Sequence, residues 1–116
     1  MHRDDCLFCK IIRGEIPSSK VYEDEYVYAF DDVSPQMPVH TLIVPKNHYD
    51  SIADGVPADE LGHLFAAVEK VADIKGVRED GFRTLVNTGA HAGQTVFHLH
   101  VHVLGGAPMN SGDPSL

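Results

Sequence analysis

The stretch Thr95–Gly106, TVFHLHVHVLGG, carries a histidine at every second position from 98 to 102, inside a run of β-branched and other apolar residues. Because successive side chains of a β-strand point to opposite faces of the sheet, His98, His100 and His102 would share one face. The apolar residues between them would share the other face, where burial in a core accounts for them. The pattern predicts a strand that packs on one side and carries chemistry on the other.

The histidine face could bind a metal, attack a substrate, or arise by chance. From His98 to His102 the backbone of a strand advances about 13 Å at roughly 3.3 Å per residue. Both rings could hardly reach one zinc ion at bonds of about 2.1 Å, so a single three-histidine metal centre is disfavoured. A neutral imidazole, with a reference pKa of about 6.5, carries a lone pair suited to attack on phosphorus. The pattern therefore favours a nucleophilic site centred on His100, and a strand that merely exposes histidines is the alternative.

The chain resembles the histidine triad (HIT) family of nucleotide hydrolases and transferases, whose motif alternates three histidines with hydrophobic residues. The similarity extends upstream through LFCKIIRGEIPS (residues 7–18), FDDVSPQMPVHTLIVPKNH (residues 30–48) and VNTGAHAGQTVFH (residues 86–98). The KIIRGEIP segment and the LGG after the third histidine are most similar to the Hint branch of small purine nucleoside phosphoramidases. The diadenosine polyphosphate hydrolase branch is the nearest rival.

Local patterns predict the secondary structure. Apolar residues recur at three- and four-residue steps between Ala58 and Lys75, which indicates an amphipathic helix, and Gly76 follows as its stop signal. A short helix is expected over Cys6–Arg13. Strands are expected over residues 21–22, 26–30, 40–45 and 82–87 and over the histidine stretch. This order predicts an α+β fold with an antiparallel five-stranded sheet. The resemblance implies the same HIT-like fold and a homodimer in which two sheets join edge to edge.

Size and charge restrict the class of protein. The 116 residues suit a single domain over 1–116, with an irregular C-terminal tail over 105–116. Nine basic against seventeen acidic side chains give a net charge of −8, which opposes non-specific binding to nucleic acid. No apolar run approaches the roughly 20 residues of a membrane helix, and the first residues lack the pattern of a signal peptide. We expect a cytoplasmic protein without a nucleic-acid or membrane partner.

Cys6 and Cys9 form a CxxC motif. In a cytosolic chain this spacing indicates metal or redox chemistry more than a structural disulfide. A redox dithiol normally follows a strand, whereas this motif opens a predicted short helix, so zinc fits better. The resemblance supplies two further ligands, His48 and His98, because zinc-bearing members of the family use the matching positions. The result would be a closed structural Cys2His2 zinc site that catalysis does not need. Two buried thiols serving as small hydrophobic residues are the alternative.

The resemblance also implies a mechanism. His100 would attack the α-phosphorus of a nucleotide and become a nucleotidyl-histidine, which water then hydrolyses. A backbone carbonyl near His98 would hold the proton on the other nitrogen of His100 and leave the attacking nitrogen bare. His102 would donate a hydrogen bond to a phosphoryl oxygen, and His40 would lie near the phosphate and the leaving group. The Thr95 hydroxyl would protonate or hydrogen-bond the leaving group.

Other residues match nucleotide-binding positions of the family. Asn87, Gly93, Gln94 and Thr95 correspond to the phosphate loop, and Asp32 would accept from the ribose hydroxyls. A flat purine needs apolar surfaces on both faces. The candidates for these surfaces are Leu7, Phe8, Ile11, Phe30, Val33 and Leu42. Ordinary core packing is the alternative for each of them.

Two departures from the Hint pattern affect the leaving group. Thr95 stands where the Hint branch usually carries serine, and the chain has no tryptophan although the Hint tail usually includes one. The expected function is hydrolysis of the P–N bond of purine nucleoside 5′-phosphoramidates, such as adenosine 5′-monophosphoramidate, through a covalent intermediate on His100. The alternatives are a diadenosine polyphosphate hydrolase and a nucleotide-binding or scaffold protein with incidental hydrolysis. The intact triad favours an enzyme, because a binding protein needs no nucleophile.

Overall fold

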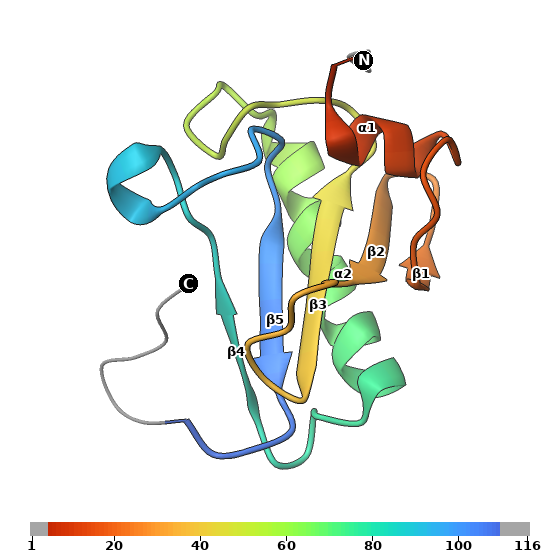
Figure 1. Ribbon diagram of the computed structural model, residues 1–116, viewed down its shortest axis with the longest axis vertical. Helices are drawn as coiled ribbons and strands as arrows, with labels where there is room; N and C mark the ends of the chain where they lie inside the picture. The colour runs from red at the N-terminus through yellow and green to blue at the C-terminus, as the bar shows by residue number, and fades with distance from the viewer. Residues whose placement is uncertain (1–4, 110–116) are drawn as a thin grey trace.

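The structure, a computed structural model, describes residues 5–109 and contains one five-stranded sheet with helices packed on it (Figure 1). The strands are β1 (Lys20–Glu23), β2 (Val27–Asp31), β3 (Val39–Pro45), β4 (Phe82–Leu85) and β5 (Val101–Gly105). The helices are α1 (Leu7–Ile12), α2 (Ala58–Lys75) and the short 3-10 helix η1 (Ala90–Ala92). The strand order is β1-β2-β3-β5-β4, and every neighbouring pair is antiparallel. The predicted α+β fold with an antiparallel five-stranded sheet is confirmed.

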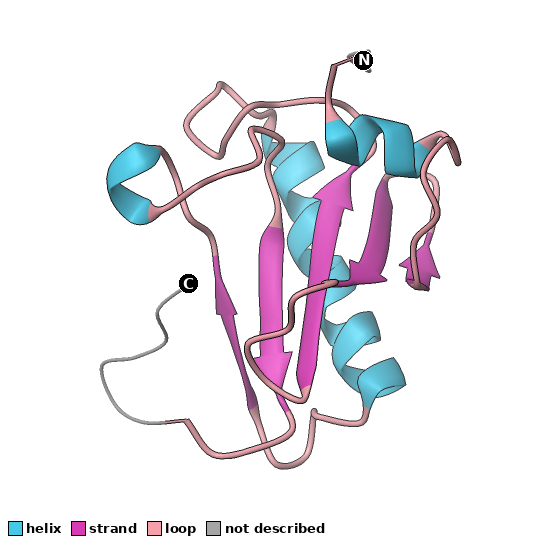
Figure 2. Cartoon of the chain, in the orientation of Figure 1, coloured by secondary structure: helices cyan, strands magenta, loops and turns pink. Residues whose placement is uncertain are grey.

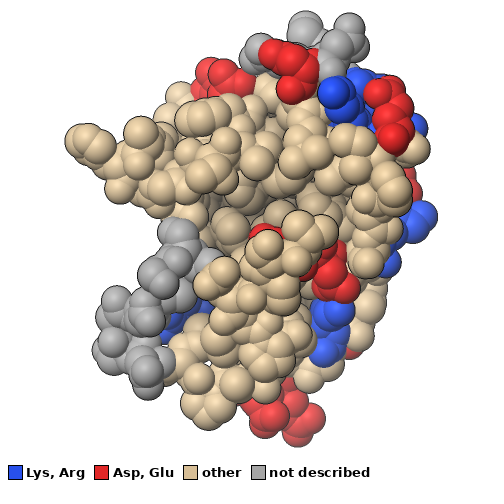
Figure 3. Space-filling model, in the orientation of Figure 1, with Lys and Arg blue, Asp and Glu red and all other residues tan. Residues whose placement is uncertain are grey.

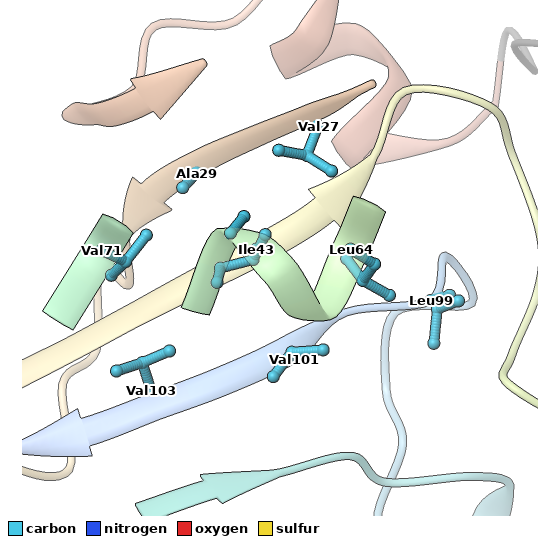
Figure 4. Close-up of a cluster of buried hydrophobic side chains, with 9 residues drawn as sticks. Val27, Ala29, Ile43, Leu64, Val71, Leu99, Val101 and Val103 are labelled. Carbon is cyan, nitrogen blue, oxygen red and sulfur yellow. The ribbon is translucent and has the colours of Figure 1, made fainter. Parts of the chain in front are cut away.

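Helix α2 covers one face of the sheet and closes the main core (Figure 4). It begins at Ala58 and ends at Lys75, as the sequence predicts, and Gly76 caps it in the left-handed conformation at φ 71°. Leu64 and Val71 are fully buried where the helix meets the sheet. The residues that β2, β3 and β5 contribute to this core are Val27, Ala29, Ile43, Val101 and Val103, and Leu99 joins them from the segment before β5. The period-two alternation of apolar residues along the strands therefore supplies the face on which α2 packs.

Helix α1 packs on the opposite face of the sheet. Tyr28 and Phe30 alternate with the core residues of β2 and point toward α1, where a second and smaller core forms. Its buried members are Cys6, Phe8, Cys9, Ile11, Tyr28, Phe30, Leu42 and Val44. Because α1 is short and lies over one end of the sheet, the rest of this face is left to loops and side chains (Figures 1 and 2).

Strand β5 begins at Val101, so only His102 of the three histidines lies within it, and the predicted strand is wrong in its extent. The pairing of β5 with β3 ends at Val101. Beyond that point Pro45 of β3 has no N–H to donate, and its carbonyl oxygen lies 2.8 Å from the Nε2 atom of His98. The side chains still alternate as predicted, because Leu99 joins the main core while the histidines are buried on the other face.

Several boundaries differ from the predictions by one or two residues. Helix α1 spans Leu7–Ile12 and not Cys6–Arg13, and β1, β2 and β3 begin or end one residue away from the expected ranges. Strand β4 ends at Leu85 and not at Asn87, because its partner β5 extends no further than Val101. Gly105 is the last residue of β5, so the irregular segment begins at Gly106, and residues 110–116 of the predicted tail lie outside the described residues. Within residues 5–109, no helix has the length and apolar character needed to cross a bilayer.

Candidate active site and metal centre

His100 and His102 open onto two adjoining cavities on the sheet face opposite α2. Figure 3 shows this face of the molecule, which is hollowed near its centre. One cavity has a volume of about 290 Å³ and polar lining residues, and the other has a volume of about 350 Å³ and mainly apolar lining residues. Asp32, Thr95, His100 and His102 line both cavities. These four residues therefore mark the boundary at which an apolar group and a polar group of one ligand would meet.

The apolar cavity lies between α1 and the histidine face. The residues expected to enclose a base all line it: Leu7, Phe8, Ile11, Phe30, Val33 and Leu42. Ile16, Pro17 and Val96 complete its wall, and sequence reasoning missed them. Ile16 and Pro17 form an apolar pair just beyond the end of α1. This pair is the sequence signal that could have placed them in the wall of the cavity. Val96 stands next to Thr95 but has no pattern of its own.

The polar cavity brings together residues from four separate segments. The expected residues His40, Asn87, Gly93 and Gln94 line it beside the four shared ones. Ser34 and Gln36 also line it and were missed, because they are exposed loop residues without a recognisable spacing. No lysine or arginine of the described residues lines either cavity. A phosphate bound here would meet neutral hydrogen-bond donors in place of cations.

The ring of His100 is held in one orientation. Its Nδ1 lies 2.6 Å from the backbone carbonyl oxygen of His98, and since that oxygen can only accept, Nδ1–H is the donor. A neutral ring then has a bare lone pair on Nε2. Phe8 packs edge-on against the ring at a centroid distance of 5.2 Å. Burial lowers the pKa of His100 below its usual value, so the ring is neutral at pH 7.

His40 and His102 lie on neighbouring strands and contact each other. The Nε2 atom of His40 lies 2.9 Å from Nδ1 of His102, and the backbone N–H of Gln36 donates to Nδ1 of His40 at 3.0 Å. Asp32 places a carboxylate oxygen 3.5 Å from Nε2 of His40. Burial lowers the pKa of both rings, that of His102 to about 4. The Nε2 atom of His102 is buried and has no hydrogen-bond partner among the described residues.

The loop between η1 and the histidines is shaped by Gln94. Its side-chain Nε2 donates to the carbonyl of Asp50 at 2.7 Å, and its Oε1 accepts from the backbone N–H of Gly89 at 2.8 Å. Gly89 and Gly93 adopt φ values of 80° and 83°, which favour glycine. The Gln94 side chain thus holds the loop in place, while Thr95 is exposed where the two cavities meet.

The four predicted metal ligands converge beside the active site. Their ligand atoms all lie within 4.8 Å of one another. Cys6 caps the N-terminus of α1, with its Sγ accepting from the N–H of Cys9 at 3.3 Å, so the helix start presents both thiols. Nδ1 of His98 lies 3.3 Å from Sγ of Cys6, and Nδ1 of His48 lies 3.4 Å from Sγ of Cys9. The cluster could hold one metal ion.

Outer partners orient the two histidine rings of this cluster. Nε2 of His98 lies 2.8 Å from the carbonyl oxygen of Pro45, and Nε2 of His48 lies 2.7 Å from a carboxylate oxygen of Asp50. Each acceptor keeps a proton on Nε2 and leaves Nδ1 bare toward the thiols. This is the arrangement in which histidine binds zinc, so the donor set fits that ion.

Comparisons with known proteins agree with this geometry. The HIT domain matches residues 13–109. The purine nucleoside phosphoramidase of Escherichia coli K12 is 44% identical over 108 residues, which cover 91% of each chain. The structure of a histidine triad protein from Clostridium difficile superposes with a TM-score of 0.91 at 47% identity, covering 97% of this chain and 100% of that one. A HIT family hydrolase from Legionella pneumophila superposes at 0.87 and 42% identity, covering 93% and 98%.

These similarities extend over nearly the whole chain and not over the triad alone. The relatives include a phosphoramidase and a HIT family hydrolase, which confirms the prediction of a HIT-family hydrolase. The solved structures confirm the predicted HIT-like fold. The chain belongs to the HIT domain family.

Proposed function

We propose that this hydrolase cleaves the P–N bond of purine nucleoside 5′-phosphoramidates, such as adenosine 5′-monophosphoramidate, through a nucleotidyl intermediate on His100. The observation that carries the proposal is the position of this ring. Its Nδ1 is tied to the carbonyl of His98 at 2.6 Å, and the ring lines both the apolar and the polar cavity. The similarity to the Escherichia coli phosphoramidase supports the substrate class.

The proposed reaction has two displacements at phosphorus. The lone pair of Nε2 of His100 forms a bond to the α-phosphorus, the P–N bond to the leaving amine breaks, and the amine departs with one added proton. Water then attacks the same phosphorus, the bond to His100 breaks, and the nucleoside monophosphate leaves as the proton is released. Covalent catalysis of this kind divides one difficult displacement into two easier ones. Nδ1–H of His100 stays bonded to the His98 carbonyl throughout.

The remaining residues bind and polarise the substrate in this proposal. His102 donates to a phosphoryl oxygen, and His40 supports it from the next strand. Thr95 hydrogen-bonds or protonates the leaving group at the boundary of the cavities. Asp32 accepts from the ribose, with one carboxylate oxygen already receiving the N–H of Ser34 at 2.8 Å. The phosphate lies against Asn87, Gly93 and Gln94, and the base occupies the apolar cavity formed by Leu7, Phe8, Ile11, Phe30, Val33 and Leu42.

Selectivity between phosphoramidates and dinucleoside polyphosphates tests the substrate class. Because no described lysine or arginine lines the cavities of a chain with net charge −8, several adjacent phosphates would be poorly neutralised. We expect kcat/KM for adenosine 5′-monophosphoramidate to exceed that for diadenosine tetraphosphate by about tenfold or more. The measurement is steady-state kinetics with both substrates at one ionic strength. Equal values, or a preference for the polyphosphate, would support the alternative hydrolase, and no turnover of either would support a nucleotide-binding protein.

The rate of hydrolysis is expected to persist in mildly acidic solution. Burial lowers the pKa of His40, with Asp32 opposing it, and lowers that of His102 to about 4. His102 therefore stays neutral well below the usual value of about 6.5, and the pKa of His40 is shifted in the same direction, so kcat should change less than about twofold between pH 7.5 and 6. The unfolded chain takes up protons near pH 6.5, whereas folded His102 does so only near 4, so the free energy of unfolding should decrease as the pH falls through this window.

A pH series checks both consequences. Profiles of kcat against pH test whether the rate of hydrolysis persists, and urea unfolding at the same pH values tests whether the free energy of unfolding decreases. A loss of kcat of about tenfold between pH 7.5 and 6 would contradict the proposal that these rings act in their neutral forms.

We further propose that Cys6, Cys9, His48 and His98 hold a structural zinc ion. Four protein ligands would close the coordination shell, so the ion would supply rigidity and no open position for catalysis. It would tie the start of α1 to the segment that leads into β5. The cluster of ligand atoms within 4.8 Å and the outer partners of both histidines support this proposal.

We also propose that the protein forms a homodimer in which the sheets of two copies join edge to edge. Among the described residues, β1 pairs with β2 alone and β4 pairs with β5 alone, so each of these strands has an unpaired side at an edge of the sheet. Edge strands present backbone groups that can pair with another chain, and pairing of two such edges would satisfy them.

A further inference from the structure

We propose that the backbone N–H of Gln36 sets, through His40, the ring tautomer in which His102 presents an Nε2–H donor to the active-site cavity. Gln36 is thus assigned as a positioning residue. The catalytic meaning of this assignment rests on the proposed function, but the tautomers themselves do not. Two consecutive contacts and one buried nitrogen without a partner carry the proposal.

The first contact fixes His40. The N–H of Gln36 points to Nδ1 of His40 at a nitrogen–nitrogen distance of 3.0 Å. A backbone N–H can only donate, so Nδ1 must be the unprotonated nitrogen of the ring. A neutral His40 then carries its proton on Nε2. The carboxylate of Asp32, 3.5 Å from that Nε2, favours a proton at the same atom.

The second contact determines the tautomer of His102 from that of His40. Nε2 of His40 lies 2.9 Å from Nδ1 of His102, which is hydrogen-bond distance for one donor and one acceptor. Because Nε2 of His40 carries the proton, Nδ1 of His102 must accept. A neutral His102 therefore carries its proton on Nε2.

The third observation concerns where this proton lies. Nε2 of His102 is buried without a partner among the described residues, and the ring lines both cavities. A buried donor without an acceptor costs free energy, so this atom is prepared to bind an acceptor such as a phosphoryl oxygen. His100, whose ring centroid is 5.0 Å away, has the opposite tautomer with Nε2 bare. One ring is thereby a nucleophile and its neighbour a donor.

A metal ion held by Asp32, His40 and His102 is the rival interpretation, since their ligand atoms also lie within 4.8 Å of one another. An ion on Nε2 of His40 would require that nitrogen to be bare and Nδ1 to carry the proton. That proton would face the N–H of Gln36 at 3.0 Å, donor against donor. The contact therefore favours a chain of hydrogen bonds over a metal site.

The loop that carries Gln36 is held by its own hydrogen bonds. The carboxylate of Asp32 accepts from the N–H of Ser34 at 2.8 Å, and the N–H of Asp32 donates to the carbonyl of His40 at 2.9 Å. Within residues 5–109, the exposed Gln36 side chain donates to the Ser34 carbonyl alone, at 3.2 Å. The proposed role thus belongs to the backbone of residue 36 and tolerates any side chain except that of proline.

The tautomers can be observed directly by NMR of the full-length protein labelled with ¹⁵N-histidine. Two-bond ¹H–¹⁵N correlations distinguish the two neutral tautomers, and the variants His40→Gln and His102→Gln assign the signals. At pH 7.5, without substrate, we expect His40 and His102 to carry the proton on Nε2 and His100 to carry it on Nδ1. A proton on Nδ1 of either His40 or His102 would overturn the proposal.

A pair of substitutions at position 36 tests the source of the effect. Gln36→Ala keeps the N–H and should keep the tautomers of the wild type. Gln36→Pro removes the N–H, so the His40 and His102 signals should become averages of two tautomers, and kcat should fall by about tenfold to a hundredfold. A folded Gln36→Pro protein with the tautomers of the wild type would overturn the proposal. If this variant does not fold, the spectrum of the wild type decides.

The outcome is separable from the proposed function. Predicted tautomers in a protein that does not hydrolyse phosphoramidates would leave the hydrogen-bond chain standing and refute the substrate class. Hydrolysis of phosphoramidates by a protein with the other tautomers would support the substrate class and refute the hydrogen-bond chain.

Discussion

Replacing His100 with glycine is expected to lower kcat for adenosine 5′-monophosphoramidate by about 10⁴-fold or more, because the substitution removes the atom that bonds to phosphorus. The ring contacts Phe8, His102 and the His98 carbonyl and lines the cavities, so the fold should survive the change. Release of ammonia from the wild type and the variant is the measurement. Far-ultraviolet circular dichroism confirms that the variant is folded.

Two controls make this result specific. His63→Gln alters a histidine on α2 that stacks on Tyr26 at a centroid distance of 3.6 Å and lines neither cavity, so its kcat should match that of the wild type. Free imidazole can enter the space that His100→Gly leaves and should restore part of the activity. Turnover by His100→Gly equal to that of the wild type would refute covalent catalysis by this residue.

Zinc removal is expected to produce the largest change in stability. Protein purified without a chelator should contain about one equivalent of zinc, and stripping the ion should lower Tm by about 10 °C or more, because a tightly bound ion stabilises only the folded state. The ion would join α1 to the segment before β5, two parts of the chain that are distant in sequence: Cys6 and His98 contact each other across 92 residues. Metal analysis and thermal unfolding before and after chelation are the measurements.

The double variant Cys6→Ser, Cys9→Ser is the matched control. It should contain no zinc, and chelation should leave its Tm unchanged. Less than about a tenth of an equivalent of zinc in wild-type protein with reduced cysteines would refute the metal assignment and favour two buried thiols that pack as small hydrophobic residues.

The elements that rest on local periodicity could be predicted from the sequence. Helix α2 has the predicted bounds, because its apolar stripe, its acidic first turn and Gly76 act within the helix itself. The start of β5 could not be predicted in this way. The pairing of β5 with β3 ends at Val101, next to Pro45 of β3. Pro45 has no N–H to donate, and its carbonyl oxygen is hydrogen-bonded to the side chain of His98, which lies far away in the sequence.

In the candidate site, too, some residues could be predicted from local sequence patterns and others depend on contacts between distant segments. The residues that line the cavities were found where they carry a recognisable motif, as the histidines do. Gln36 was missed, because a backbone N–H that donates to a ring nitrogen leaves no trace in the side-chain pattern. Ser34 was missed because it is an exposed loop residue without a recognisable spacing. Gln94 was predicted beside a phosphate, and the structure adds that its side chain braces the loop through Asp50 and Gly89. Such contacts arise only when distant segments meet.

In the proposed reaction, Nε2 of His100 forms a bond to the α-phosphorus of the substrate. Mass spectrometry of protein quenched in acid-free denaturant during turnover of an adenosine phosphoramidate would detect the product of this step. We expect an adenylylated peptide that contains His100, with the modification placed on that residue by fragmentation and absent from His100→Gly. If the modified peptide is absent at millisecond sampling under full turnover, or if the modification lies on another histidine, His100 is not the nucleophile.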